Sequence, residues 1–278
     1  MDIVYHTMED SDRVSDLLLD LASQKRRGIL LGIKNNNFGI TKLAASLDST
    51  PPEIHRNVER LLKDGLIQKD SEKEYVLSPI CEAMLSQIST IEFFEKHSKY
   101  FKKHGFAGLP TKFLLRLGQL SDCKEVNGFV RVQEEWNKIY QEAEEFVRNV
   151  LYEVSYSSDI VKTVVSQVNK GVAFRSIFSA DAIVSNQRQS ALGSKSLKKA
   201  LDSGKIERKI NSDVQFVLIM NEKQACLSFP DEDFEVDVSS CMSSKSSEFV
   251  DWCNDYFGFL WKESSFFNEK RLNLASKS

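Results

Sequence analysis

Residues 49–63, STPPEIHRNVERLLK, place cationic and hydrogen-bonding side chains directly after two consecutive prolines. Thr50 is of a type that caps helices, Pro51 suits a first helical position, and Glu53 stands three residues after Thr50, as a capping box requires. The prolines therefore start a helix. A guanidinium such as that of Arg56 can donate two hydrogen bonds to the edge of a guanine base. Recognition of a nucleic acid is the chemistry that these residue types and spacings offer.

The predicted helix has two faces of different character. Its apolar residues repeat at the spacing of one helical stripe, and Gly65 follows as a left-handed stop. Glu53 and Glu59 share the polar face and weaken its positive field, so an ordinary solvated helix face is the alternative interpretation. The stripe consists of Ile54, Val58, Leu61 and Leu62, and the polar face of His55, Arg56, Glu59, Arg60 and Lys63.

The surrounding pattern predicts a winged helix-turn-helix domain over residues 1–80. Apolar positions repeat at helical spacing before the capped helix, and two β-like segments follow it around a polar turn. The predicted elements are two helices within 11–33 with a break near Ser23, a short helix over 40–47, the capped helix from Pro51, and strands at 66–70 and 74–78.

Domains of this class lay the second helix of the motif in the major groove of DNA, with its N-terminal residues nearest the base edges. Acidic residues nearly cancel the basic ones over 13–73, so we expect modest affinity for double-stranded DNA that depends strongly on salt. A homodimer would double the contacts, and 11–22 and 81–104 carry the apolar surfaces that we assign to its interface. The predicted DNA-contacting residues are Thr41, Lys42, Ser49, Thr50, His55, Arg56, Arg60, Lys63, Lys69 and Lys73.

A second domain is expected beyond a helical connector over 81–108, whose end is marked by Gly105, Gly108 and Pro110. From 109 to 278 strands alternate with helices, which predicts an α/β sandwich with a mixed sheet and makes the whole chain a multidomain α/β protein. The expected helices are 109–120, 130–150, 159–171, 194–204 and 246–264, the expected strands are 150–157, 172–178, 205–210, 214–220, 224–230 and 234–240, and residues 263–278 receive no role.

The last predicted helix is rich in aromatic residues, whose helical spacing is more typical of a core than of a ligand-stacking surface. For a sensor pocket, polar groups at strand ends are better candidates. Arg175, within an apolar strand, needs an acidic partner or an anionic ligand, and a structural salt bridge is the alternative to ligand binding. The stripe consists of Phe249, Trp252, Cys253, Tyr256 and Leu260, and the candidate ligand-binding residues are Ser157, Arg175 and Ser179.

The composition and the missing motifs argue against several classes of protein. The net charge of −3 gives no global basic field, and no run approaches the roughly 18 apolar residues of a transmembrane helix. The five cysteines lack a CxxC pair, which indicates reduced thiols in a cytoplasmic protein. The usual phosphate-binding, dinucleotide, zinc-protease and hydrolase motifs are missing, and the cysteines have no histidine in the same predicted domain. The acidic run at 231–237 is expected to be a solvated loop. We therefore expect no cofactor, no metal, no membrane partner and no enzymatic activity.

Several stretches carry a resemblance to a known family. They are ITKLAASL, TPPEIHRNVERLLKDGLI and YVLSPIC in the first domain, and LPTKF, NKGVAFRSIF and WCNDYFGFLWKES in the second. With them the chain resembles the archaeal winged helix-turn-helix transcriptional regulators of the methanogenesis and filament regulatory protein family. The resemblance implies a DNA-binding regulator whose effector domain is similar in fold to a phospholipase D half-unit and to the sugar-sensing domain of TrmB-like regulators. It also implies a small-molecule effector.

Two other functions stay open. A protein-interaction module, in which the winged domain docks to protein, is compatible with the near-neutral charge. A phosphodiesterase of the phospholipase D type needs two histidines in HxK motifs, and no histidine follows residue 104, which makes this the third choice. The histidines are His6, His55, His97 and His104.

Overall fold

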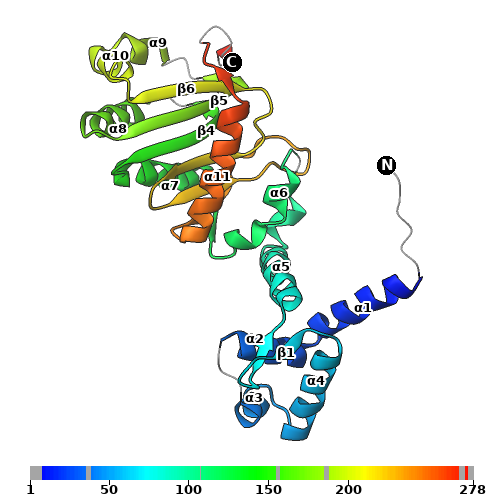
Figure 1. Ribbon diagram of the computed structural model, residues 1–278. Helices are drawn as coiled ribbons and strands as arrows, with labels where there is room; N and C mark the ends of the chain where they lie inside the picture. The colour runs from blue at the N-terminus through cyan, green and yellow to red at the C-terminus, as the bar shows by residue number, and fades with distance from the viewer. Residues whose placement is uncertain are drawn as a thin grey trace. The chain divides into compact units, whose positions relative to one another are not determined.

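The protein is described by a computed structural model that covers residues 8–35, 39–106, 108–154, 157–184, 188–268 and 273–274. Its contacts divide the chain into two compact units, Met1–Ile88 and Ser89–Ser278. Figure 1 shows a helical unit with a hairpin and a unit built on a large sheet. Across the described ranges, no helix has both the length and the apolar character needed to cross a membrane.

The first unit consists of helices followed by a short antiparallel hairpin. The strands pair from Ile67 opposite Leu77 to Lys69 opposite Tyr75. Gly65, at φ 73°, lets the chain turn from the last helix into the hairpin. These elements lie close to where the sequence predicts them. They are α1 (Met8–Ala22), α2 (Gln24–Lys34), α3 (Ile40–Ser46), α4 (Pro51–Lys63), β1 (Ile67–Lys69), β2 (Tyr75–Leu77) and the start of α5 (Pro79–Lys96).

The apolar stripe of α4 faces the core of this unit. Ile54, Val58 and Leu61 are at most 1% exposed, and they pack with Ile29 and Leu30 of α2. Burying each such side chain stabilises the fold by about 1.5–3 kcal/mol. This packing fixes α4 by one face and leaves its opposite face to solvent.

The second unit is built on one mixed sheet. Strands β4, β5 and β6 are parallel, and β7, β8, β9 and β3 continue the sheet in antiparallel fashion beyond β4. The order is β10-β6-β5-β4-β7-β8-β9-β3, with β11 beside β5. The strands are β3 (Lys124–Asn127), β4 (Phe146–Val154), β5 (Ala173–Val184), β6 (Ile206–Asn211), β7 (Val217–Asn221), β8 (Ala225–Ser228), β9 (Ser240–Ser244), β10 (Ser265–Phe266) and β11 (Asn273–Leu274).

Helices cover both faces of this sheet, as the mixed α/β prediction requires. Figure 1 shows α11 running across one face of the sheet, and its aromatic stripe is buried there, so the prediction of a core stripe is confirmed. Apolar residues of α7 and α8 pack on the other face. The helices are α6 (Thr111–Leu114), α7 (Phe129–Glu142), α8 (Ser158–Asn169), α9 (Arg188–Gly193), α10 (Lys195–Leu201) and α11 (Ser247–Glu263), with 3-10 turns at Tyr100–Lys102 and Leu117–Leu120.

Two predicted elements are wrong. The helix expected over 130–150 ends at Glu142, and the next residues enter β4. The strand expected over 234–240 is instead a turn with Phe234 at φ 64°, and the serine-rich β9 follows it. At the first place pairing of β4 with β5 and β7 overrides the local helical pattern. At the second, residues 234–239 pair with no strand in the described sheet.

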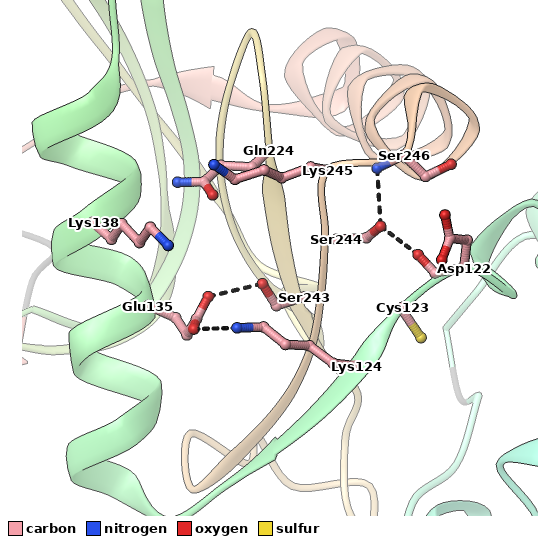
Figure 2. A pocket seen from close by; sticks show the side chains of 10 residues that line it. All are labelled: Asp122, Cys123, Lys124, Glu135, Lys138, Gln224, Ser243, Ser244, Lys245 and Ser246. Atoms are coloured by element: carbon pink, nitrogen blue, oxygen red, sulfur yellow. Dashed lines mark hydrogen bonds and ion pairs between the residues drawn. The ribbon is translucent and has the colours of Figure 1, made fainter.

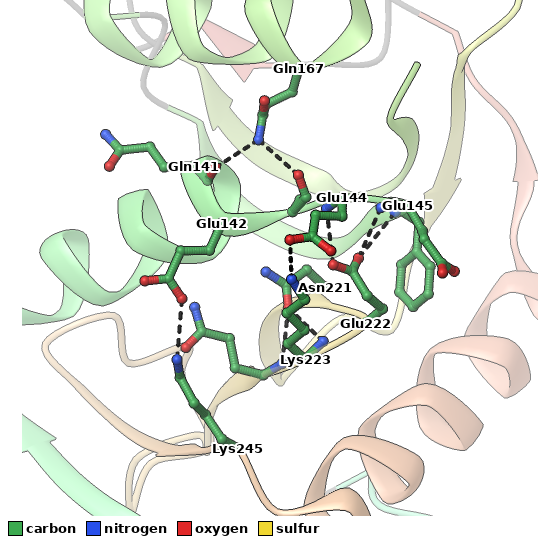
Figure 3. A network of polar contacts seen from close by, with 12 residues as sticks. Gln141, Glu142, Glu144, Glu145, Gln167, Asn221, Glu222, Lys223 and Lys245 are labelled. Carbon is green, nitrogen blue, oxygen red and sulfur yellow. Dashed lines mark hydrogen bonds and ion pairs between the residues drawn. The ribbon is translucent and has the colours of Figure 1, made fainter. Parts of the chain in front are cut away.

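Glu222, in the turn between β7 and β8, explains why α7 stops. Its carboxylate accepts hydrogen bonds from the backbone N–H groups of Glu144 at 2.9 Å, Glu145 at 3.2 Å and Phe146 at 3.3 Å (Figure 3). Burial works to raise the pKa of Glu222, but the backbone donors outweigh it and the pKa is lowered. These three hydrogen bonds satisfy backbone N–H groups that a longer α7 would have used in its own helical hydrogen bonds.

The structure divides the chain differently from the predicted boundaries 1–80, 81–108 and 109–278. Phe93 and Tyr100, inside the predicted connector, are buried in the same core as Trp252 of α11. Residues 89–108 therefore belong to the second unit, because their aromatic side chains are buried in its core.

Candidate nucleic-acid interface

Helices α3 and α4 are joined by a tight turn that sets the direction of α4. Asp48 adopts φ 46°, in the left-handed region that aspartate tolerates better than most residues. The Ser49 N–H then donates to the Ala44 carbonyl at 2.9 Å. Helix α4 begins at Pro51 with Thr50 as its N-cap, as predicted.

The side chain of Thr50 does not form its part of the predicted capping box. Thr50 has the extended backbone of an N-cap, but its side chain makes no capping hydrogen bond. The Glu53 carboxylate accepts a hydrogen bond from the Ser49 hydroxyl at 2.7 Å, and it meets Lys25 Nζ at 2.6 Å. The Lys25 hydrogen bond is the main reason that the pKa of Glu53 is lowered. The acid nearest the start of α4 is therefore neutralised within the unit.

Free cations remain on the exposed side of α3 and α4. Lys42, Arg56 and Lys63 are exposed, and none makes a hydrogen bond or ion pair with any residue that the structure describes. Thr41 is exposed beside Lys42. These four, together with Thr50 and Lys73, are available to an outside partner without breaking a side-chain hydrogen bond or ion pair to a described residue.

Arg60 is engaged within the protein. Its Nε lies 2.9 Å from the carboxylate of Asp20, which is 0% exposed and also meets Arg26 Nε at 2.9 Å. Asp64, four residues on, lies 3.5 Å from Arg60. Burial raises the pKa of Asp20 and the contact with Asp64 adds to this, while the two guanidinium groups oppose it. Arg60 thus links α4 to α1 through an ion pair.

His55 and the two hairpin lysines are exposed, and other side chains of the same unit lie near them. His55 Nδ1 lies 3.5 Å from Glu59, and both side chains are exposed. Lys69 Nζ lies 5.2 Å from the centre of the Tyr75 ring, and Lys73 sits in the hairpin turn at φ 65°. Asp70 shapes this turn by accepting the N–H groups of Glu72 and Glu74 at 2.9 Å each, so acidic side chains surround the tip.

The three candidate ligand residues of the second unit are not gathered in one site. Ser157 caps α8 by accepting the Ile160 N–H at 3.4 Å, and Ser179 is a buried residue of β5. Arg175 is exposed rather than buried, and its Nε lies 2.9 Å from Glu207. The structural salt bridge is the alternative that the geometry of Arg175 fits.

A cysteine and a histidine do share one unit, contrary to the expectation from sequence. His97 Nδ1 lies 2.6 Å from Glu125 Oε1, and His97 Nε2 lies 3.5 Å from the Cys123 sulfur. The sequence predicts a connector over 81–108, and therefore separates His97 and His104 from the domain that holds Cys123. Burial raises the pKa of the Cys123 thiol to about 12, which keeps it protonated at neutral pH.

Cys123 also borders a polar pocket of about 570 Å³, shown in Figure 2. Two of its charged side chains pair with each other: Glu135 accepts from Lys124 at 2.5 Å and from the Ser243 hydroxyl at 3.0 Å. Lys245 pairs with Glu142, which does not line the pocket. The side chains of Asp122 and Lys138 make no hydrogen bond or ion pair with a described residue.

A second polar cluster contains serine, histidine and aspartate. His104 Nε2 lies 2.9 Å from both Asp237 and Ser240, and the Ser240 hydroxyl donates to Asp237 at 2.7 Å. A hydrolytic triad needs the acid on the other ring nitrogen, but His104 Nδ1 faces the Tyr100 carbonyl at 2.9 Å. The cluster joins β9 and Asp237, just before it, to residues 100–104.

No family model matches the chain, and no curated protein matches it either. Among solved structures, TrmBL2, an archaeal chromatin protein described as showing a novel mode of DNA binding, is 12% identical, with 87% of this chain and 93% of that chain covered and a TM-score of 0.39. The phospholipase D family member Nuc from Salmonella typhimurium is 11% identical, covers 53% of this chain and 100% of its own, and has a TM-score of 0.35. NucT from Helicobacter pylori is 11% identical, with coverages of 52% and 100% and a TM-score of 0.37. All three TM-scores lie below 0.5, so the proposals that follow rest on the residues of this chain.

Proposed function

We propose that the protein is a DNA-binding transcriptional regulator of the cytoplasm, and that its first unit is a winged helix-turn-helix. In this proposal α3 and α4 form the helix-turn-helix, α4 enters the major groove, and the β1–β2 hairpin is the wing. The order of elements and the tight turn at Asp48 support it.

The observation that carries the proposal is which charged side chains of α4 have ion-pair partners within the protein and which do not. Arg56 is exposed and unpaired among the described residues, whereas Glu53, the acid nearest the start of the same helix, is paired with Lys25 at 2.6 Å. Glu59 lies farther along the helix, 3.5 Å from His55. Pairing removes the charge cancellation that the sequence implied at the start of the helix. A positive field remains where base edges would lie.

Roles follow from this distribution. Arg56 is the candidate for a bidentate contact to guanine, and Lys42, Lys63 and Thr41 are candidates for phosphate contacts. Arg60 acts inside the protein by holding α4 to Asp20. We keep Ser49, Thr50, His55, Lys69 and Lys73 as secondary contacts.

The proposal includes a homodimer and no catalytic activity. One copy offers few free cations, and two copies would read two half-sites with twice the phosphate contacts. Exposed apolar residues of α1 supply a surface for pairing, among them Val14 at 57% and Leu18 at 59% exposure. A small-molecule effector on the second unit would act by favouring one spacing of the two reading helices.

The test is binding of the purified full chain to fragmented genomic DNA, including its own promoter, at about 50 and 200 mM salt. We expect retention of selected fragments at the higher salt, because base contacts are less sensitive to salt than phosphate contacts. Equal retention of all fragments would indicate non-specific binding. No retention at either salt would contradict the proposal and favour a winged domain that docks to protein.

A further inference from the structure

Two arginines occupy neighbouring positions on the face of the sheet that α11 crosses. The parallel register places Arg148 of β4 opposite Arg175 of β5, and adjacent strands are about 4.8 Å apart. Arg148 Cζ lies 5.7 Å from the centre of the Phe257 ring, and Arg175 Cζ lies 5.6 Å from the centre of the Trp261 ring, so both side chains are on the α11 side. Like charges at adjacent positions of a sheet repel each other. An anion bound between the members of this arginine pair would relieve the repulsion.

Arg148 has no acidic partner among the described residues. It is only partly exposed, and it makes no hydrogen bond or ion pair with them. Burial and the positive charge of Arg175 lower the pKa of Arg148, and no carboxylate opposes them. Its neighbour on β7 is Met220, which brings no charge. The N–H donors of this guanidinium are therefore free for an acceptor from another molecule.

Arg175 is engaged at one atom. Its Nε donates to Glu207 Oε1 at 2.9 Å, and the two side chains are 46% and 52% exposed. Ion pairs that are this exposed contribute little to stability. The Nη groups of Arg175 make no hydrogen bond with a described residue. They are available to a second acceptor beside Glu207.

Aromatic rings restrain the two guanidinium groups. Arg148 Cζ lies 4.3 Å from the centre of the Phe146 ring, in addition to its contact with Phe257. The rings of Phe257 and Trp261 stack with their centres 5.6 Å apart. Packing against a ring restrains a guanidinium without using its N–H donors in conventional hydrogen bonds. The arginine pair is thus held in place with its donors unused, which lowers the entropic cost of binding an anion.

We propose that the arginine pair binds the phosphate group of a small phosphate monoester. Such a group has three terminal oxygens and a charge of about −1.5 to −2 at pH 7. One guanidinium can donate to two of these oxygens, and the other can donate to the third. A carboxylate, or the phosphodiester of a DNA backbone, has two free oxygens and one negative charge, which suits a single guanidinium.

The surroundings of the arginine pair favour a small molecule over an acidic segment of a protein. Phe257 of α11 borders the pair at Arg148, and the carboxylate of Glu207 borders it at Arg175. An extended anionic chain that continued past Arg175 would be repelled by Glu207. The positive surface is therefore matched by one compact anion.

The proposed site differs from the ligand residues predicted from sequence. Of Ser157, Arg175 and Ser179, only Arg175 takes part, and its neighbour Arg148 is not among them. The site lies wholly within the second unit, so its binding can be measured without DNA.

The test is isothermal titration calorimetry of the full chain with glycerol 3-phosphate, at constant ionic strength and without DNA. Dimethyl phosphate, a diester with a single charge, is the matched probe. We expect one saturable site per chain for glycerol 3-phosphate and at least about tenfold weaker binding of dimethyl phosphate. A short phosphoserine peptide presents the same monoester on a protein segment, and we expect it to bind no more tightly than glycerol 3-phosphate.

Variants locate the binding and give effects of opposite sign. Arg148→Gln and Arg175→Gln each remove one guanidinium and should weaken binding at least about tenfold. Arg148→Lys keeps the charge but loses the planar fork, and its affinity should lie between those of Arg148→Gln and the unmodified chain. Glu207→Gln should strengthen binding about threefold, because it removes the carboxylate that competes for Arg175. Arg131→Gln changes an exposed arginine of α7 and should leave the affinity unchanged.

Four results would overturn the proposal. The first is no saturable binding of glycerol 3-phosphate to the unmodified chain. The second is equal affinity for dimethyl phosphate, which would indicate a site for diesters such as a DNA backbone. The third is unchanged binding in both Arg148→Gln and Arg175→Gln. The fourth is at least about tenfold tighter binding of the phosphoserine peptide, which would assign the site to a protein partner. DNA binding by the first unit could persist in each case, so the two proposals fail separately.

Discussion

Arg56 and Arg60 lie about one turn apart on α4 and differ in what they contact. Arg56 is exposed and makes no ion pair with a described residue, whereas Arg60 meets the buried carboxylate of Asp20 at 2.9 Å. Arg56 keeps its charge free, and Arg60 uses its charge to hold α4 against α1. Two cations at helical spacing therefore have separate tasks, and the difference is set by an aspartate forty residues earlier in the chain.

The largest expected effect concerns the anchored arginine, Arg60, and its partner Asp20. Asp20→Ala should lower the free energy of unfolding by about 3 kcal/mol, because it leaves Arg26, whose side chain is 16% exposed, and Arg60 without their shared partner. Urea denaturation measures this change. Asp16→Ala, which removes an exposed acid from the same helix, is the control and should stay within about 0.5 kcal/mol. Equal stability of the two variants would show that the Asp20 cluster anchors nothing.

The free arginine is tested by Arg56→Ala. We expect DNA affinity to fall by about 2 kcal/mol, roughly 30-fold, with relaxed specificity at one base pair, and stability to change by less than about 0.5 kcal/mol. Fluorescence anisotropy with a selected fragment measures the affinity. Arg131→Ala removes an equally exposed arginine from α7 and should leave binding unchanged. A similar loss in both variants would mean that net charge alone is responsible.

The Lys63→Ala variant tests whether Lys63 contacts the phosphate backbone or a base. Lys63→Ala should weaken binding to all sequences alike and reduce the slope of log K against log salt by about 1. Titrations at four salt concentrations measure the slope. A loss confined to the selected fragment would instead assign Lys63 to base recognition.

The smallest effect concerns Glu53. Its pKa in the folded protein is lowered from the model-compound value of 4.5, mainly by the hydrogen bond from Lys25. The stabilisation is therefore complete above that value and is lost as the pH falls through the lowered folded pKa. Denaturation between pH 3 and 7 should show a shallower acid loss in Glu53→Gln than in the unmodified chain. Parallel curves would contradict the role of this ion pair.

Much of the first unit could be predicted from its sequence because the signals there are local. The start of α4 at Pro51 and the left-handed Gly65 depend on residues within one or two turns. The partners of the charged side chains could not be predicted in this way, since Asp20 reaches Arg60 and Lys25 reaches Glu53 through tertiary packing.

The strands of the second unit could likewise be predicted from the sequence only in part. The parallel segment β5 begins with a mostly apolar sequence, and β6 has isoleucines at positions 206 and 210; both strands overlap the predicted ones. The serine-rich β9 could not, because pairing with β8 and β3 makes it a strand, and the end of α7 depends on Glu222 about eighty residues later. The sequence also gives no sign that Asn149 of β4 and Ser176 of β5 lie side by side, because only the strand register shows it.

The most direct test of the central claim is to measure DNA affinity and unfolding free energy together for Arg56→Ala and Arg60→Ala. The account predicts a crossed result: Arg56→Ala loses DNA binding and keeps its stability, whereas Arg60→Ala loses stability by about 1–2 kcal/mol and, at a temperature where it stays folded, binds DNA nearly as the unmodified chain does. Equal loss of DNA binding in the two variants, or unchanged binding in Arg56→Ala, would contradict it.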